Sequence, residues 1–174
     1  MGNPMIDAST RIRVASPADS DAVSALLTAS YSSLLADRYD SDALNRALPL
    51  ITRANPALLA SGTYYVAEGQ PGHLVGCGGW MTAHPGSGEI IEGEAHIRHF
   101  ATHPEWARRG VGTSLLARCI SDARRLGIHK LHCFSTLNAE RFYRASGFDT
   151  VGPIDVPLRP SMTFSGILMS RELA

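Results

Sequence analysis

Residues 100–127 constrain the fold more than any other stretch of this chain. In the second half of the stretch, apolar residues recur at the spacing of one helical face. They are Val111, Leu115, Leu116, Cys119, Ile120, Ala123 and Leu126. Arg118, Asp122 and Arg125 fall mostly off this stripe, and Gly127 is suited to a left-handed C-cap. The pattern predicts a helix with one buried face that ends at Gly127.

The entrance to this helix is almost bare backbone. The segment 109–113, R-G-V-G-T, offers unpaired amides at the positive end of the helix dipole, with two positions that lack a side chain. Such an entrance is an anion site, most naturally one for phosphate. A P-loop would need a lysine after Gly112, where Thr113 and Ser114 stand. A dinucleotide fingerprint would need a glycine in place of Leu115.

The run H-P-E-W-A-R-R-G-V-G-T-S-L-L resembles the coenzyme A loop of the GNAT superfamily of N-acetyltransferases. The family pattern is Gln or Arg, two residues, Gly, any residue, then Gly or Ala, and Gly110 and Gly112 match its last positions. Ala107 stands at the first position, which removes one side-chain contact and leaves the backbone cradle. The resemblance implies that Arg108 and Arg109 flank the pyrophosphate and neutralise part of its charge. A glycine-rich helix start with two solvated arginines is the alternative.

A second run, L-N-A-E-R-F-Y-R-A-S-G-F, looks like the GNAT signature that follows the next strand. Two motifs in the expected order are more specific than either alone. The resemblance covers the whole chain, strongly from Ile97 to Phe148 and weakly before Tyr64. It implies a single domain, residues 1–174, with a mixed α/β fold. The sheet would be twisted, with about seven strands, flanked by helices, and a splayed parallel pair of strands would bind coenzyme A.

The rest of the chain reads as alternating strands and helices. Strands are expected at 11–15, 63–68, 74–81, from 95 onward, at 130–136, near 150 and at 164–169. Helices are expected after the Ser16 cap, over 31–53 with an interruption near 40–42, and at 139–146. Three glycines, Gly76, Gly78 and Gly79, indicate a bulge or a close backbone approach. A proline-containing loop, 153–160, is expected between the last two strands.

The strand that begins near Ala95 breaks its own period. Ala95 and Ile97 alternate as an inward face, but the next large apolar residue, Phe100, is an odd step away. This break predicts a β-bulge between Ile97 and Phe100. In the GNAT resemblance the bulge opens the gap for the pantetheine arm, which pairs with backbone groups of Phe100, Ala101 and Thr102. By the same resemblance the Phe100 N–H is the oxyanion donor.

The implied reaction is acetyl transfer from acetyl-CoA to a primary amine, by direct attack in a ternary complex. The amine must arrive neutral, the oxyanion needs donors, and the leaving thiolate needs a proton. The resemblance assigns the last role to Tyr143, whose ordinary pKa of about 10 keeps it protonated. A packed helix tyrosine is the alternative. Asn138 is placed to bind the pantetheine or to cap its own helix, and both roles are compatible.

The general base is less defined. Glu94 and His96 share one strand face, which points toward the acceptor cleft, and either could pass a proton through water. A solvated charge at the strand end is the alternative for Glu94. His99 and His103 lie nearby, but spacings of three and four do not converge on one strand, so no metal is expected.

The resemblance places the acceptor site beside variable segments. Tyr31 and Tyr39 are therefore candidate substrate contacts, with a place in the core or at the rim as the alternative. The acceptor is expected to be a small-molecule or peptide amine, and nothing in 31–62 or 153–163 narrows it further. By analogy with the family, the chain could form a homodimer.

Composition excludes several functions. Net charge is zero, with a pI near 7.1, so no broad field attracts nucleic acid or a membrane surface. Three cysteines, Cys77, Cys119 and Cys133, lie in apolar segments without a C-x-x-C pair, as is typical of reduced, buried thiols in the cytoplasm. No apolar run approaches a membrane span, and residues 1–10 lack the apolar core of a signal peptide. A non-catalytic acyl-CoA sensor or partner module remains the alternative class.

Overall fold

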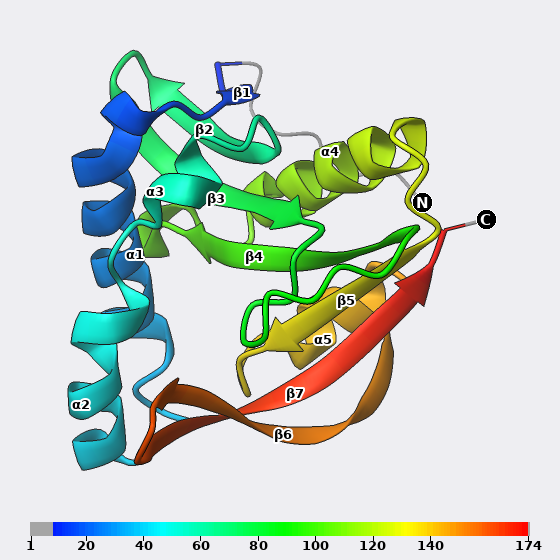
Figure 1. The fold of residues 1–174 in the computed structure, drawn as a ribbon. Helices are drawn as coiled ribbons and strands as arrows, with labels where there is room; N and C mark the ends of the chain where they lie inside the picture. Colours follow the sequence, from blue (N-terminus) through cyan, green and yellow to red (C-terminus); the bar gives the residue numbers. More distant parts are fainter. Residues whose placement is uncertain (1–8, 174) are drawn as a thin grey trace.

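The computed structural model describes residues 9–173, which form a seven-stranded sheet with helices on both faces (Figure 1). Residues 1–8, on which most of the signal-peptide expectation rests, lie outside this range. The strand order is β1-β2-β3-β4-β5-β7-β6. All neighbouring strands are antiparallel except β4 and β5, which run parallel. The helix predicted over 111–126 connects these two strands in the sequence. The mixed α/β architecture expected from the sequence is confirmed.

The strands are β1 Arg11–Val14, β2 Tyr64–Gln70, β3 His73–Met81, β4 Glu94–Thr102, β5 Lys130–Ser135, β6 Asp149–Arg159 and β7 Met162–Glu172. The α-helices are α1 Ser20–Leu34, α2 Ser41–Ile51, α3 Pro56–Leu59, α4 Val111–Arg125 and α5 Glu140–Ala145. Two short 3-10 turns, η1 Pro17–Asp19 and η2 Pro104–Trp106, precede α1 and α4. The sequence pattern missed α3, because a single helical turn is too short to show a period.

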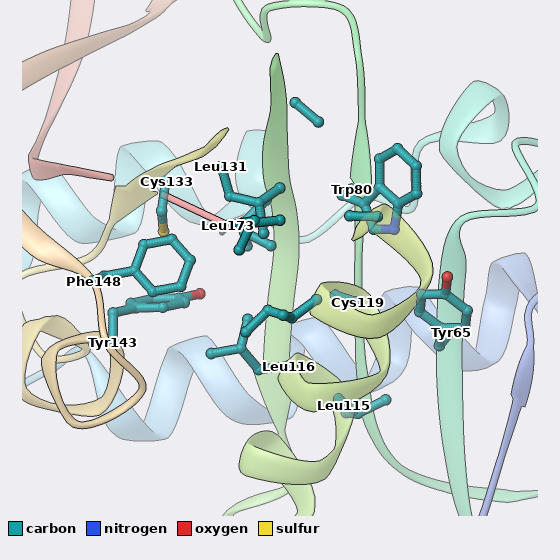
Figure 2. Packing of buried hydrophobic residues seen from close by; sticks show 14 of the residues in the cluster. Tyr65, Trp80, Leu115, Leu116, Cys119, Leu131, Cys133, Tyr143, Phe148 and Leu173 are labelled. Atoms are coloured by element: carbon teal, nitrogen blue, oxygen red, sulfur yellow. The ribbon is translucent and has the colours of Figure 1, made fainter. Parts of the chain in front are cut away.

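Period-two alternation divides the core between the two faces of the sheet. On β2, Tyr65 and Ala67 pack with α4, whereas Tyr64 and Val66 pack with α1. Figure 2 shows Leu115, Leu116 and Cys119 of α4 beside the sheet residues of the first of these cores. A third cluster joins α2 to the β6–β7 hairpin through Leu44, Ala47 and Phe164. The hairpin turn reaches toward α2 at the lower left of Figure 1.

The predicted β-bulge lies in β4. Between the pairs Gly79–Arg98 and Cys77–Ala101, β4 carries one residue more than β3. His99 has a φ of 49°, and the extra residue reverses the alternation, so that Ile97 packs on the α4 face and Ala101 on the α1 face. Pairing with β5 is confined to Glu94–His96. The strands therefore separate from Ile97 onward, as the family resemblance implied.

Three glycines of β3 allow neighbouring residues to approach its backbone closely, and Gly78 does so beside the bulge. A Cβ on Gly78 would lie 2.5 Å from the Phe100 ring, and one on Gly76 would lie 2.5 Å from Val111. A Cβ on Gly79 would meet the Thr63 carbonyl at 2.4 Å. The close backbone approach expected from these glycines is confirmed.

The helix α4 matches the predicted stripe with two corrections. Gly110, with φ 82°, is its N-cap and Gly127, with φ 83°, follows its C-cap. Leu126 was assigned to the buried stripe but is 65% exposed, because the helix ends before it. Asp122 was placed mostly off the stripe but is buried, where Tyr65 donates to its carboxylate at 2.7 Å and Arg118 and Arg125 pair with it.

The loop predicted over 153–160 is wrong. Residues 153–159 lie in β6, which continues to Arg159 and pairs with β7, and only Pro160 lies in the turn. Pro153 and Pro157 are compatible with this strand because β6 is the edge of the sheet, where a missing N–H breaks no second ladder. The resulting long hairpin forms one wall of the cavity described below.

Candidate active site

A cavity of about 690 Å³ passes through the gap between β4 and β5. On the α4 side it is lined by the start of α4, by Trp106 and by Phe142 of α5. On the α1 side it is lined by residues of α1 and α2, with Ile51 among them, and by Phe164 of the β6–β7 hairpin. The separation of the two strands thus joins a site on one face of the sheet to a site on the other.

The helix entrance forms an amide cradle on this cavity. The first bond of α4 runs from the Ser114 N–H to the Gly110 carbonyl at 3.0 Å, so the amides of residues 111–113 precede the helix ladder. Gly110 and Arg108 have left-handed φ angles of 82° and 64°, which turn the chain sharply into the helix. Free amides at the positive end of a 15-residue helix favour a bound anion.

Nearly all residues predicted to bind the cofactor line this one cavity. They are Phe100, Ala101, Thr102, Arg108, Gly110, Val111, Gly112, Thr113, Asn138 and Tyr143. Arg109 is not among the lining residues. Its guanidinium lies over the Trp106 ring at 5.0 Å, so of the two predicted arginines Arg108 lies on the cavity.

Two tyrosines hold the backbone of the bulge. Tyr31 of α1 donates to the Phe100 carbonyl at 2.9 Å, and Tyr64 of β2 donates to the His99 carbonyl at 2.8 Å. Burial raises the pKa of both phenols, so both remain neutral donors. Tyr31 also lines the cavity, and its contact with substrate stays a prediction. These bonds fix the backbone where β4 and β5 separate.

Tyr143 lies in the gap between the two sides of the cavity. It is 5% exposed and contacts the rings of Phe142, Phe148 and Phe100. Figure 2 shows its hydroxyl end pointing into the core region near Cys133, away from the helix that carries it. Burial raises its pKa well above 10, so the phenol keeps its proton throughout the neutral range. A protonated phenol in such a place can supply a proton to a leaving group.

Asn138 does not cap its own helix. The N-cap of α5 is Ala139, without a side-chain bond, whereas Asn138 Nδ2 donates to the Leu34 carbonyl and to Asp37, each at 2.9 Å. This corrects the capping half of the expectation. Asn138 lines the cavity, and its Oδ1 is buried without a hydrogen-bond partner. This oxygen could therefore accept a hydrogen bond from an amide of a bound ligand.

Tyr39 lies behind the cavity wall. Its hydroxyl donates to the Ser165 carbonyl at 2.7 Å and accepts from the Leu137 N–H at 2.9 Å. Its ring stacks on Phe164 with centroids 4.4 Å apart. Tyr39 therefore ties the β6–β7 hairpin to the segment before α5, and substrate contact by this residue stays a prediction.

The two predicted bases, Glu94 and His96, belong to a row of polar side chains on β4 and β5. Glu94 bonds to the Nε2 of His132 at 2.8 Å, and the His96 ring lies 5.1 Å from His132 and 5.2 Å from His84. The bond with His132 lowers the pKa of Glu94. Burial, then the neighbouring histidines, lower the pKa of His96 to about 4. Neither Glu94 nor His96 lines the cavity, because the first lining residue of β4 is Ile97.

Sequence reasoning missed His132 and Arg98. His132 stands opposite His96 in the parallel register, a signal that was available once β4 and β5 were taken as neighbours. Arg98 lines the cavity on β4, directly before the bulge. His103, once considered beside the bases, instead accepts from the Glu105 N–H in the turn before α4. Within residues 9–173 no group of three His, Cys, Asp or Glu side chains is arranged to hold a metal ion.

One cavity thus combines the exposed amides at the start of α4 with a parallel strand pair whose pairing ends at His96. Residues 60–150 match a sequence profile described as an acetyltransferase (GNAT) domain, which is more than half of the 174 residues. The chain belongs to the GNAT acetyltransferase family. A comparison with curated protein sequences finds no match.

Solved structures share this fold. A GCN5-related N-acetyltransferase from Rhodopseudomonas palustris is 22% identical, with a TM-score of 0.74, covering 97% of this chain and 99% of that one. The PaiA N-acetyltransferase from Thermoplasma acidophilum, solved with coenzyme A, is 16% identical, with a TM-score of 0.69 and coverage of 94% and 98%. The ribosomal-protein-S18-alanine N-acetyltransferase from Escherichia coli is 15% identical, with a TM-score of 0.62 and coverage of 95% and 94%.

Proposed function

We propose that this protein transfers an acetyl group from acetyl-CoA to a primary amine. The observation that carries the proposal is the single cavity that joins the amide cradle of α4, the unpaired edge of β4 and the buried Tyr143. The cradle suits the diphosphate of the coenzyme, and the gap between β4 and β5 suits the extended pantetheine arm. The coenzyme A complex of a structural neighbour supports the same donor.

Direct attack by the amine is the route that the cavity favours. The amine nitrogen forms a bond to the thioester carbon, the Phe100 N–H stabilises the oxyanion, and the carbon–sulfur bond then breaks. Tyr143 gives its proton to the thiolate, and the proton of the amine leaves through the base. Among residues 9–173, the thiol that lines the cavity belongs to Cys133, and burial raises its pKa to about 12. A protonated thiol is a poor nucleophile, so an acetyl-cysteine intermediate is disfavoured.

The family fold leaves open which amine accepts the acetyl group, because the acceptor side of the cavity is built from α1, α2 and the β6–β7 hairpin. Neighbours named for a ribosomal-protein alanine and for N-acetylglutamate synthesis show that one fold serves different acceptors. The part of the chain that the structure describes contains no helix long and apolar enough to cross a membrane. The cysteines are free and buried, which supports the proposed cytoplasmic location.

The function is tested by release of coenzyme A thiol from acetyl-CoA in the presence of a panel of amines. We expect amine-dependent release at a rate well above hydrolysis, and a product heavier than its amine by one acetyl group. Binding of coenzyme A without release for any amine would favour the sensor or partner module instead. Absence of coenzyme A binding would contradict the proposal altogether.

The base is tested by the pH dependence of kcat/KM. Because burial lowers the pKa of His96 to about 4, His96 is neutral and able to accept a proton at every pH above that value. If His96 is the base, activity falls as pH drops through about 4, and His96→Ala loses this limb together with roughly 100-fold in rate. Glu94→Gln is the parallel test for Glu94. Retention of the limb and of the rate in both variants excludes both residues.

A further inference from the structure

Arg98 places an unpaired positive charge on the cavity. It lies on β4 directly before the bulge, where it pairs through its backbone with Gly79 and lines the cavity. Within residues 9–173 its guanidinium has no hydrogen bond and no ion pair. Burial lowers its pKa from the ordinary value, but a guanidinium remains charged in proteins at neutral pH. A half-buried charge without a partner is unfavourable unless a ligand supplies one.

No acidic side chain on the cavity pairs with the guanidinium of Arg98. Among the described residues that line the cavity there is no aspartate or glutamate, and the charged ones are Arg98 and Arg108. Burial, followed by repulsion from Arg98, lowers the pKa of His99 to about 4, so His99 is neutral. Under the proposed function Arg108 faces the diphosphate of the coenzyme. Arg98, on the far side of the bulge, has no such partner.

The alternation along β4 places Arg98 on the acceptor side. Arg98 shares the strand face of Glu94 and His96, opposite to that of Ile97, which packs with α4. The Tyr64 hydroxyl, which acts on Arg98, and the Tyr31 hydroxyl on the cavity are both neutral and already donate to backbone carbonyls. This side of the cavity is mostly apolar, with Leu34, Leu35, Ile51, Leu158 and Phe164, and the serines Ser30 and Ser165 are polar but uncharged. One cation in an apolar pocket selects for an anion attached to an apolar body.

We propose that the acceptor is a small amine that carries a carboxylate and an apolar group, and that Arg98 binds the carboxylate. A planar guanidinium can hold a carboxylate with two parallel hydrogen bonds, which also orients the amine toward the thioester. The proposal rests on the proposed acetyl transfer, and it names the chemical class that the transfer acts on. An acceptor with additional positive charge is disfavoured by the same arginine.

The experiment compares matched amines: phenylalanine, phenylalaninamide and 2-phenylethylamine, and the corresponding leucine series. Wild-type protein is expected to acetylate the free acid most efficiently, although its amine is more basic than that of the amide and so less often neutral. In Arg98→Gln, kcat/KM for the acid falls about 10- to 30-fold, as expected for the loss of a charged hydrogen-bonded pair, while the amide is hardly affected. Arg98→Lys is expected to recover part of the preference for the free acid over the amide, because lysine keeps the positive charge but cannot form two parallel hydrogen bonds to a carboxylate.

Coenzyme A affinity provides the folding and site control. It stays within about twofold of wild type in Arg98→Gln if the arginine acts on the acceptor alone. The matched control is Arg124→Gln, which removes the same charge from an exposed position of α4 and leaves the preference intact. Equal use of acid and amide by wild type, a preference that survives in Arg98→Gln, or a loss confined to coenzyme affinity overturns the proposal. Binding of coenzyme A without acetylation of any amine overturns the proposed function itself.

Discussion

Replacing Tyr143 by phenylalanine is expected to lower kcat by about 100-fold or more, while the Kd for coenzyme A changes by less than about twofold. The hydroxyl is the group that could protonate the leaving thiolate, and the ring provides the packing against Phe142 and Phe148. Phenylalanine keeps the ring and removes the proton donor. Steady-state kinetics and calorimetric titration with coenzyme A separate the two effects.

Tyr65→Phe is the matched control for this substitution. Tyr65 is equally buried and donates to Asp122 at 2.7 Å, but it packs on α4 outside the cavity. Its loss should lower thermal stability and leave kcat unchanged, because it leaves a buried carboxylate with one donor fewer. Should Tyr143→Phe retain wild-type kcat, or lose turnover only in proportion to stability as Tyr65→Phe would, Tyr143 is a packing residue and not the acid.

If Tyr143 is the general acid, its pKa also limits how kcat can depend on pH. Burial raises the pKa of Tyr143 well above 10, so the phenol is not lost as pH rises from 7 to 10. A fall of kcat on the basic side below pH 10 must therefore come from another group. On the acidic side, the lowered pKa of His96 extends its neutral form down to about pH 4.

The central part of the fold was predictable because local chemistry determines it. The stripe of α4, its glycine ends and the bulge before Phe100 all leave a periodic signal in the sequence. The edge strand β6 did not, because Pro153 and Pro157 indicate a loop unless the order of strands is known. Asp122 was misplaced for a related reason. Arg118 and Arg125 stand one helical turn away and can be seen in the sequence, but Tyr65, whose hydroxyl donates to the buried carboxylate, lies on β2 and cannot.

The candidate site divides in the same way. The amide cradle is a continuous motif, so its residues were found in the sequence and lie together on the cavity. The proposed acceptor side combines Tyr31 of α1, Arg98 of β4 and Phe164 of β7, and no spacing rule connects these residues in the sequence. Arg98 can be recognised as a candidate binding residue only from the structure. The position of the bulge determines which face of β4 it occupies, and the cavity lining shows that no carboxylate pairs with it. Tyr39 differs from these residues, because its hydroxyl is engaged by Ser165 and Leu137 and it does not line the cavity, so its contact with substrate stays a prediction.

Gly110→Ala is expected to weaken coenzyme A binding by about 100-fold, equivalent to the loss of about one charge-assisted hydrogen bond. Gly110 has a φ of 82° at the N-cap of α4, and the three free amides of residues 111–113 are aimed by this turn. A Cβ there disfavours the left-handed conformation by roughly 1 kcal/mol, so the turn that aims these amides at the cavity is expected to change. Calorimetric titration with coenzyme A measures the change.

The control is Gly127→Ala at the other end of the same helix. Gly127 has a φ of 83° and nothing within 4 Å of an added Cβ, so the substitution imposes the same backbone strain away from the cavity. Both variants should lose a similar amount of stability, whereas only Gly110→Ala should lose affinity. If affinity falls equally in both, the coenzyme responds to the stability of α4 as a whole. Only a loss restricted to Gly110→Ala attributes diphosphate binding to the amides at the start of α4.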